Sequence, residues 1–190
     1  ELRQELEKKG HRFKSNSDTE VIVHGYEEYG YECVKKLNGM FAFAIWDSNK
    51  RELFLARDRL GKKPLYYYSK DEKFIFGSEI KAILEHDVDL TIDFSAIDYY
   101  LSFLYIPAPL SIYKYAKKLE AGHYLILKNN KIKIIEYWDL KLSENKLSEK
   151  ENIRLLEKLM IDGTEKRLIS DVPLGAFLSG GLDSSLITAI

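Results

Sequence analysis

The middle of the chain consists of apolar runs of strand length that short polar turns separate. Residues 40–46 read MFAFAIW, which is apolar on both faces and therefore predicts a central strand buried on two sides. Residues 47–50 form a polar turn, and residues 52–57 return as the partner strand. Two more hairpins are predicted, over residues 64–77 around Asp71 and over residues 122–135 around Asn129 and Asn130.

Helical spacing of apolar residues predicts helices beside these hairpins. Ser17-x-x-Glu20 has the form of a capping box, and the helix that follows it should be interrupted near Gly25 and Gly30. Antiparallel hairpins with helices beside them indicate an α+β layered domain over residues 1–139. The other predicted helices cover residues 2–9, the stretch around Val34 and Leu37, Ser78 to Leu84, and Asp93 to the prolines at 107 and 109.

The pattern of apolar and polar residues changes after residue 139. Residues 140–147 are mostly polar and predict a linker, and residues 148–169 follow as an amphipathic helix. Residues 172–178 predict a short apolar strand, which a Gly-Gly turn joins to a last helix. This order predicts that residues 148–190 begin an α/β domain with a parallel sheet.

Composition narrows the class of protein. The chain has 190 residues, is 45% hydrophobic and 31% charged, and carries a formal net charge of −1. This is the composition of an ordinary globular protein, and it gives no support for nucleic-acid binding. No apolar run approaches the roughly 20 residues that a membrane span needs. A single cysteine, Cys33, fits a reducing compartment, so we expect a cytoplasmic protein without membrane association.

Both ends of the sequence fall inside predicted helices. Leu2 and Leu6 already have helical spacing, and no initiator Met precedes them. Ile190 lies in an apolar helix that has barely begun. We expect the chain to be an internal piece of a longer protein.

Residues 179–185, SGGLDSS, lie between the last predicted strand and helix. Gly180 and Gly181 would let the backbone turn sharply and approach an anion closely. The N–H groups at the start of the following helix would favour a bound phosphate. Asp183 beside an anion implies a bridging Mg²⁺ ion. The segment therefore predicts an ATP phosphate site, the alternative being a plain glycine turn of an α/β fold.

No Lys follows these glycines, so the segment is not a Walker A loop. It resembles instead the Ser-Gly-Gly-x-Asp-Ser loop of PP-loop ATP pyrophosphatases. That resemblance implies cleavage between the α and β phosphates of ATP, adenylation of a substrate and release of pyrophosphate.

Nearly the whole chain resembles glutamine-dependent asparagine synthases of the asparagine synthetase B type. The resemblance implies an incomplete N-terminal-nucleophile hydrolase-like α+β sandwich, a class II glutaminase domain, followed by the start of an α/β PP-loop domain. It rests on five segments: SDTEVIVHGYEEYG (17–30), NGMFAFAIWD (38–47), ARDRLGKKPLYY (56–67), FGSEIKAIL (76–84) and SDVPLGAFLSGGLDSS (170–185).

The chemistry that this resemblance implies joins two sites. An N-terminal Cys hydrolyses glutamine, and the ammonia passes through an internal tunnel. ATP adenylates the β-carboxylate of aspartate and releases pyrophosphate, and ammonia attacks the aspartyl-AMP to give asparagine and AMP. Glutamine, aspartate, ATP and Mg²⁺ are thus the expected ligands, and a homodimer is one possible assembly.

The resemblance also implies roles for individual residues. Asp18 aligns with the carboxylate that holds the α-ammonium group of glutamine, and we favour this role over helix N-capping, with which it is compatible. Asp183 would hold Mg²⁺ through the pyrophosphate. The residues that align with the ATP-binding segment are Leu178, Ser179, Gly180, Gly181, Asp183 and Ser184.

The sequence also departs from the family. Glu1 is not a Cys, and the early Arg and Asn-Gly-Glu contacts to glutamine have no counterpart, so no catalytic residue is assigned in this chain. Cys33 is internal and is interpreted as a small core residue. Two other functions stay open for this sequence: a related amidotransferase or β-lactam-forming ligase that acts on another carboxylate, and a non-catalytic structural module.

Three other groups of residues have non-catalytic interpretations. The run Arg57-Asp58-Arg59 predicts an ion-paired network that fixes the loop before Gly61. Lys117 and Lys118 are interpreted as a solvated pair. The four histidines share no ligand spacing with the lone cysteine, which argues against a zinc site.

Overall fold

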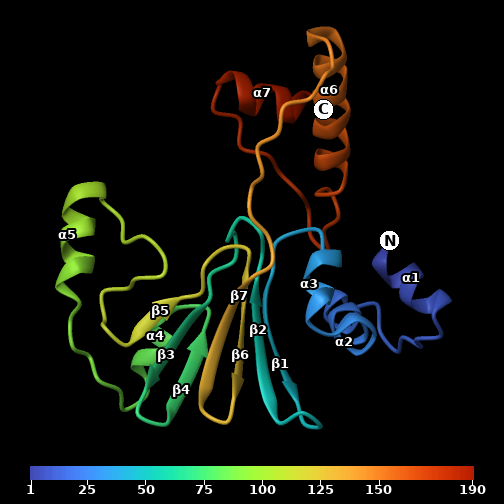
Figure 1. The fold of residues 1–190 in the computed structure, drawn as a ribbon. Helices are drawn as coiled ribbons and strands as arrows, with labels where there is room; N and C mark the ends of the chain where they lie inside the picture. Colours follow the sequence, from blue (N-terminus) through green and yellow to red (C-terminus); the bar gives the residue numbers. More distant parts are fainter. The chain divides into compact units, whose positions relative to one another are not determined.

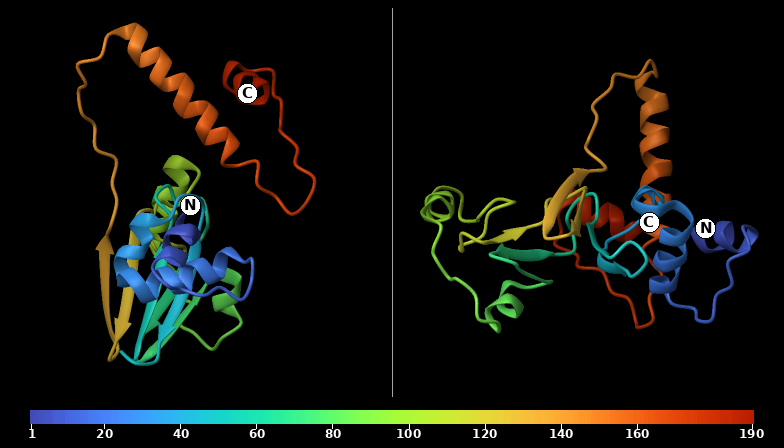
Figure 2. Two further views of the ribbon diagram at one scale, coloured as in Figure 1. Left: turned by 90° about the vertical axis from the view of Figure 1, so that its right-hand side faces the viewer. Right: turned by 60° about the horizontal axis from the view of Figure 1, so that its bottom comes forward.

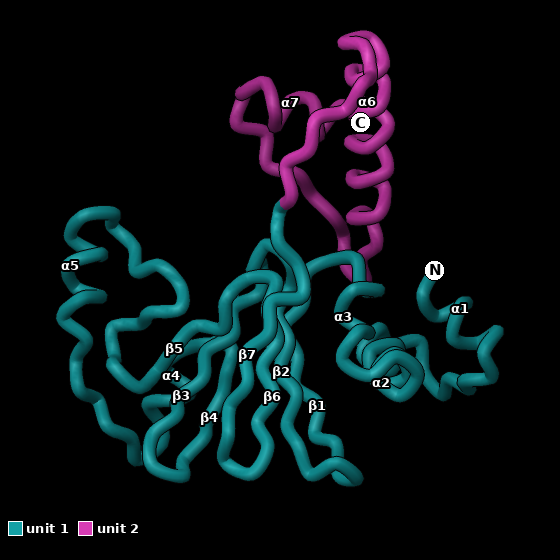
Figure 3. Tube along the Cα trace, viewed as in Figure 1, with its two compact units in different colours: residues 1–140 teal, residues 141–190 magenta.

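The computed structural model describes all 190 residues and divides them into two compact units, residues 1–140 and residues 141–190 (Figure 3). Unit 1 is a layered α+β structure, and unit 2 contains helices and connecting segments (Figure 1). No helix has the length and apolar character needed to cross a membrane.

The first sheet of unit 1 contains four antiparallel strands in the order β1-β2-β6-β7 (Figure 1). Its hairpins form where turn residues interrupt the alternating pattern. Asn129 and Asn130, for example, both have positive φ angles, as a two-residue hairpin turn requires. The strands are β1 (Ala42–Asp47), β2 (Glu52–Arg57), β6 (His123–Lys128) and β7 (Lys131–Glu136).

The second sheet has the order β4-β3-β5 and is also antiparallel. The predicted hairpin around Asp71 is confirmed as β3 (Tyr66–Lys70) and β4 (Lys73–Gly77). β5 (Ala116–Lys118) pairs with the other edge of β3 and was not predicted.

Unit 1 contains six helices, of which four precede the first strand and two lie between β4 and β5 along the chain. In the left view of Figure 2, α2 and α3 lie in front of the strands of the first sheet. The helices are α1 (Leu2–Lys8), α2 (Asp18–Tyr29), the 3-10 helix η1 (Gly30–Glu32), α3 (Cys33–Lys36), α4 (Ile80–Leu84) and α5 (Phe94–Phe103).

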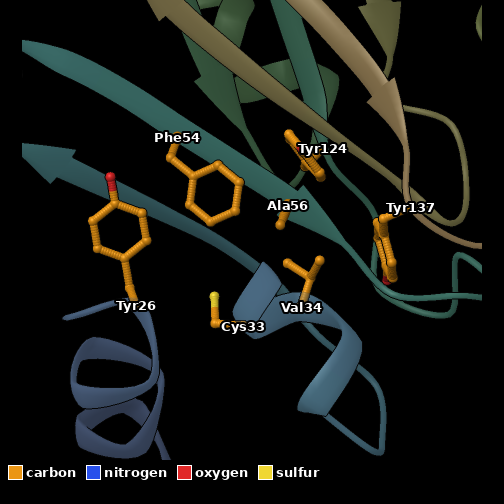
Figure 4. Packing of buried hydrophobic residues seen from close by; sticks show 7 residues of the cluster. All are labelled: Tyr26, Cys33, Val34, Phe54, Ala56, Tyr124 and Tyr137. Atoms are coloured by element: carbon orange, nitrogen blue, oxygen red, sulfur yellow. The ribbon is translucent and has the colours of Figure 1, made fainter. Parts of the chain in front are cut away.

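One face of the first sheet packs against α2 and α3. Phe54 and Ala56 of β2 are fully buried there, and Val34 of α3 meets them from the helical side. Burial of each such large apolar side chain contributes about 1.5–3 kcal/mol. Figure 4 shows the whole cluster: Tyr26, Cys33, Val34, Phe54, Ala56, Tyr124 and Tyr137.

The opposite face of the first sheet packs against the second sheet. Leu55 of β2 and Leu125 of β6 are paired in register, and both contact the cluster that includes Tyr67 of β3. On the far side of the second sheet, Ile83 of α4 packs against Tyr68. Unit 1 is therefore a helix–sheet–sheet–helix sandwich, as the resemblance implied.

The prediction that residues 40–46 form a central, doubly buried strand is wrong. β1 pairs only with β2 and lies at the edge of its sheet, and Trp46 is 62% exposed. The strand buried on both faces is β2, because β1 and β6 occupy its two edges and Phe54, Leu55 and Ala56 are fully buried.

Three helix boundaries also differ from the predictions. Ser17 caps α2, but Glu20 faces the preceding turn, so no capping box forms there. α2 continues through Gly25 without interruption and ends at Gly30. Ser78 is not the cap of α4, whose first flanking residue is Glu79.

Lys117 and Lys118 are not a solvated pair. Both lie in β5, and the Nζ atom of Lys118 donates to the carbonyl oxygen of Ile106. Burial lowers the pKa of Lys118. Lys117 lies 3.6 Å from the carboxylate of Asp93, which caps α5 as predicted.

Unit 2 begins with α6 (Glu149–Glu165), where a full capping box joins Ser148 and Glu151. α7 (Leu182–Ala189) is the last helix. The predicted strand over residues 172–178 does not form, and the segment is an irregular connection. A strand needs a neighbour to accept its hydrogen bonds, and no second strand is present in this unit.

Candidate functional site

A cavity of about 400 Å³ opens at the start of α2 within unit 1. Four stretches of the chain contribute to its wall: the first turn of α2, the approach to β1, the loop after β2 and the residue after β4. The lining residues are Asp18, Thr19, Ile22, Met40, Phe41, Ala42, Phe43, Lys63, Pro64 and Ser78.

Asp18 is the first residue of α2 and is exposed. The Ser17 hydroxyl caps the helix by accepting a hydrogen bond from the N–H of Thr19 at 3.1 Å, so Asp18 is not needed as the cap. Its carboxylate accepts one long hydrogen bond, 3.5 Å from Thr19 Oγ1, and forms no ion pair. A carboxylate at this position lies near the positive end of the helix dipole.

Glu20 fixes the turn that leads to Asp18. Its carboxylate accepts hydrogen bonds of 2.7 Å from the N–H groups of Lys14 and Ser15, and the Ser15 hydroxyl donates at 2.6 Å. These bonds lower the pKa of Glu20 to about 2, with the Lys14 N–H as the largest cause. The charged side chain therefore orders the chain just before the cavity wall.

Asp58 connects two parts of the cavity wall. It is 1% exposed, and its carboxylate accepts hydrogen bonds from four main-chain N–H groups. One donor, Phe41, lies beside β1, and another, Lys63, lies in the loop after β2, so a single side chain ties two parts of the wall together. The four donors are Phe41, Leu60, Lys62 and Lys63, at 2.9–3.3 Å.

The predicted ion-paired network at Arg57-Asp58-Arg59 is half correct. These residues do fix the loop before Gly61, but none of them forms an ion pair. The guanidinium group of Arg57 donates to the carbonyl oxygens of Gly61, Lys63 and Leu119 instead. Arg59 donates to the carbonyl oxygens of Lys35 and Leu37.

The cavity is lined by groups of both charges. Lys63 is an exposed lining residue whose ammonium group forms no ion pair. The Asp18 carboxylate forms no ion pair either. An unpaired carboxylate and an unpaired ammonium group in one cavity complement a small zwitterion such as an amino acid. Sequence reasoning found Asp18 but missed Lys63 and Ser78, since their segments meet only in the folded chain.

Cys33 is confirmed as a core residue. It begins α3, is 1% exposed and packs in the cluster shown in Figure 4. Burial raises the pKa of its thiol to about 11. A thiol held in this state is a poor nucleophile.

The glycine segment of unit 2 turns directly into α7. Gly180 has a φ of +79°, which favours glycine, and a Cβ atom there would meet no protein atom within 4 Å. Gly181 precedes the first helical residue, and no side chain caps the helix. The first N–H groups of α7 are thus left for another partner, and the open backbone around Gly180 would let an anion approach.

Serine hydroxyls hold this turn together. Ser179 Oγ lies 2.9 Å from Ser184 Oγ, and Ser184 also donates to the carbonyl oxygen of Gly181 at 3.1 Å. Asp183 is exposed in the first turn of α7. Leu178 looked like a buried strand residue, but it is 62% exposed. The hydroxyl, glycine and carboxylate groups fit a nucleotide phosphate with Mg²⁺.

Two families match successive parts of the chain. Residues 1–138 match the family described as glutamine amidotransferase domain, and residues 155–190 match the family described as asparagine synthase. The boundary between the matches falls close to the boundary between the two structural units.

Individual relatives agree with these matches. The chain is 42% identical to asparagine synthetase (glutamine-hydrolyzing) 3 of Bacillus subtilis over 192 residues, which cover 100% of the chain and 31% of the relative. It is 38% identical to asparagine synthetase (glutamine-hydrolyzing) 1 of the same organism over 191 residues, covering 100% of the chain and 30% of the relative. The chain thus spans about a third of the length of these curated relatives.

A solved structure has the same fold as unit 1. It is glutamine phosphoribosylpyrophosphate amidotransferase from B. subtilis, with a TM-score of 0.50 and 23% identity over 72% of this chain and 26% of that one. This likeness supports the N-terminal-nucleophile hydrolase-like sandwich and carries nothing about the ligand. The chain therefore belongs to the family of glutamine amidotransferase domains, and its residues 155–190 match the asparagine synthase family.

Proposed function

We propose that the protein containing this chain is a glutamine-hydrolysing asparagine synthetase. The observation that carries this proposal is the presence, in one chain, of an amidotransferase unit whose cavity holds the unpaired Asp18 and of the Ser-Gly-Gly-Leu-Asp-Ser turn at an uncapped helix start. The first would bind a nitrogen donor and the second an energy source. The names of the relatives support glutamine as the nitrogen donor and asparagine as the product.

In the first unit, glutamine would occupy the cavity at the start of α2. Asp18 would accept hydrogen bonds from its α-ammonium group, and Lys63 lies in the same wall as a partner for its α-carboxylate. Asp58 and Glu20 would position these walls without touching the ligand. The residue that attacks the amide is not assigned within this sequence.

In the second unit, the triphosphate of ATP would lie against the start of α7. Main-chain N–H groups after Gly181 and the hydroxyls of Ser179 and Ser184 would bind its oxygens. Mg²⁺ held by Asp183 would neutralise phosphate charge when bound. The proposed reaction adenylates aspartate with release of pyrophosphate, and ammonia from glutamine then converts aspartyl-AMP to asparagine with release of AMP. We expect the 190 residues alone to be inactive.

The test uses the full-length protein with aspartate, glutamine and Mg-ATP. Formation of asparagine with AMP and pyrophosphate is expected, whereas ADP and phosphate as products would contradict the proposal. A panel of other carboxylic acids separates asparagine synthesis from a related amidotransferase, which would use one of those acids better than aspartate.

Two variants distinguish the two candidate sites. Asp18→Ala should lose most synthesis with glutamine but retain it when ammonium salts replace glutamine. Asp183→Ala should lose synthesis with either nitrogen source but still hydrolyse glutamine. Asp98→Ala, which changes an exposed carboxylate on α5, is the control and should leave all three activities intact. Equal loss of every activity in both variants would reject the assignment of separate sites.

A further inference from the structure

Two histidines from different segments meet beside α2. His11 follows the turn after α1, and His24 lies near the middle of α2. Their Nδ1 atoms are 3.2 Å apart, and their side chains are only 16% and 18% exposed. This pair lies outside the cavity at Asp18 and has no role in the proposed reaction.

A carboxylate completes the cluster. Glu27 Oε2 lies 2.7 Å from His24 Nδ1 and 3.6 Å from His11 Nδ1. We propose that His11, His24 and Glu27 bind a divalent metal ion of the zinc class. Donor atoms bound to one tetrahedral zinc ion lie roughly 3.3 Å apart, so the observed distances of 2.7, 3.2 and 3.6 Å need little adjustment.

The outer nitrogen of His11 supports this assignment. His11 Nε2 lies 3.2 Å from the Glu28 carboxylate, within hydrogen-bond distance. Histidines that bind a metal commonly donate the other ring N–H to a carboxylate, which fixes the tautomer. The His11 ring is placed to do so, and its Nδ1 atom is then free to bind a cation. His24 Nε2 lies 3.7 Å from the Glu20 carboxylate, which is too long for a hydrogen bond.

A cation at the centre of the cluster would satisfy three groups that otherwise face one another. With both Nε2 atoms protonated, the two Nδ1 atoms and the Glu27 carboxylate all present lone pairs to the centre of the cluster. A metal ion accepts all three pairs and leaves a fourth position for water. Two imidazoles and one carboxylate, without a thiolate, form a donor set that suits Zn²⁺ better than soft ions.

The ion would have a structural role. It would tie residue 11 to α2 and so close the turn that ends at Asp18. Phe13 in this turn packs edge-on against the His24 ring, with centroids 4.7 Å apart, and covers one side of the cluster. The sequence analysis predicted no zinc site because no histidine has a ligand spacing with Cys33. The cluster in the structure does not include that cysteine, so the spacing to Cys33 did not bear on it.

Calorimetric titration of the purified, chelator-treated full-length protein with Zn²⁺ tests the proposal. His11→Ala and His24→Ala should each weaken the binding of one zinc ion by roughly 100-fold, and Glu28→Gln by roughly 10-fold or more, since outer partners tune the ligands. His86→Ala and His123→Ala are matched controls and should bind like the unchanged protein. Equal zinc binding in all five variants would overturn the proposal.

Two further measurements guard against misfolded variants. Glu27→Gln keeps the size of the side chain and one acceptor, and it should weaken zinc binding while leaving the far-UV circular dichroism unchanged. Co²⁺ bound to the unchanged protein should give the visible absorption of a tetrahedral site, and His24→Ala should lose it. Absence of any zinc-dependent rise in the thermal unfolding midpoint of the unchanged protein would also count against the site.

Discussion

The main-chain N–H of Lys63 donates a hydrogen bond of 2.9 Å to the carboxylate of Asp58, a side chain that is 1% exposed. The same carboxylate accepts from Phe41 in another part of the cavity wall. The shape of the candidate glutamine cavity therefore depends on a residue that does not line it.

Replacement of Asp58 should destabilise unit 1. Asp58→Ala removes the acceptor of four main-chain N–H groups, so the free energy of unfolding should fall by about 2–4 kcal/mol. Urea unfolding measures this change. Asp98→Ala, at an exposed position, should change it by less than about 0.5 kcal/mol. A similar small effect of both substitutions would show that the four hydrogen bonds contribute little.

The buried thiol of Cys33 should be chemically inert in the folded protein. With its pKa raised to about 11, roughly one molecule in a thousand carries the thiolate at pH 8. Iodoacetamide should therefore label Cys33 only after urea is added. In the full-length protein, Cys33→Ala should keep its glutaminase activity; loss of that activity without loss of folding would make Cys33 part of the catalytic machinery.

Local signals in the sequence predicted the hairpins well. Asp71, Asn129 and Asn130 all have positive φ angles at the turns where polar residues interrupt apolar runs. Such turns depend on a few neighbouring residues, so one sequence is enough to locate them. The start of α5 at Asp93 was found for the same reason.

Non-local pairing could not be predicted. The apolar residues of β1 fit a central strand, but the neighbour that makes β2 central is β6, about 70 residues further along the chain. The cavity could not be predicted for the same reason, because Lys63 and Ser78 are far from Asp18 in the sequence and line the same cavity only in the folded chain. Asp58 looked like one member of an ion pair, since a sequence does not reveal which charges are buried against main-chain N–H groups.

The position of α1 should depend on the charge of Glu5. Its carboxylate accepts a hydrogen bond of 2.6 Å from the Tyr29 hydroxyl and one of 2.9 Å from Lys36 Nζ. These bonds, with Tyr29 first, lower the pKa of Glu5 below its ordinary value of 4.5. The stabilisation is therefore fully present above about pH 4.5 and is lost as the pH falls through the lowered pKa.

Hydrogen exchange of the α1 amides measures this dependence. Glu5→Gln should speed exchange at pH 7, after correction for the intrinsic rate, and the difference from the unchanged protein should disappear in acid. Glu7→Gln is the control, because Glu7 pairs only with Arg3 on the same helix. If the exchange rates of Glu5→Gln and the unchanged protein differ by the same factor at every pH, the effect does not come from the charge of Glu5.

Gly122 should be the glycine least tolerant of substitution. Its φ is +67°, and a Cβ atom there would lie 2.3 Å from the carbonyl oxygen of Trp138. Its own carbonyl oxygen accepts hydrogen bonds from Tyr137 and Trp138, so the two segments cannot separate without losing them. Gly122→Ala should therefore lower the free energy of unfolding by about 3 kcal/mol or more.

Gly25 provides the matched comparison within the same unit. It lies inside α2, and a Cβ atom there would make an ordinary contact of 3.7 Å with Cys33. Since alanine favours a helix by up to about 1 kcal/mol over glycine, Gly25→Ala should leave the protein as stable as before or slightly more so. Urea unfolding of the two variants should give changes of opposite sign or clearly different size. Equal destabilisation would mean that the backbone at Gly122 can shift away from Trp138 at little cost.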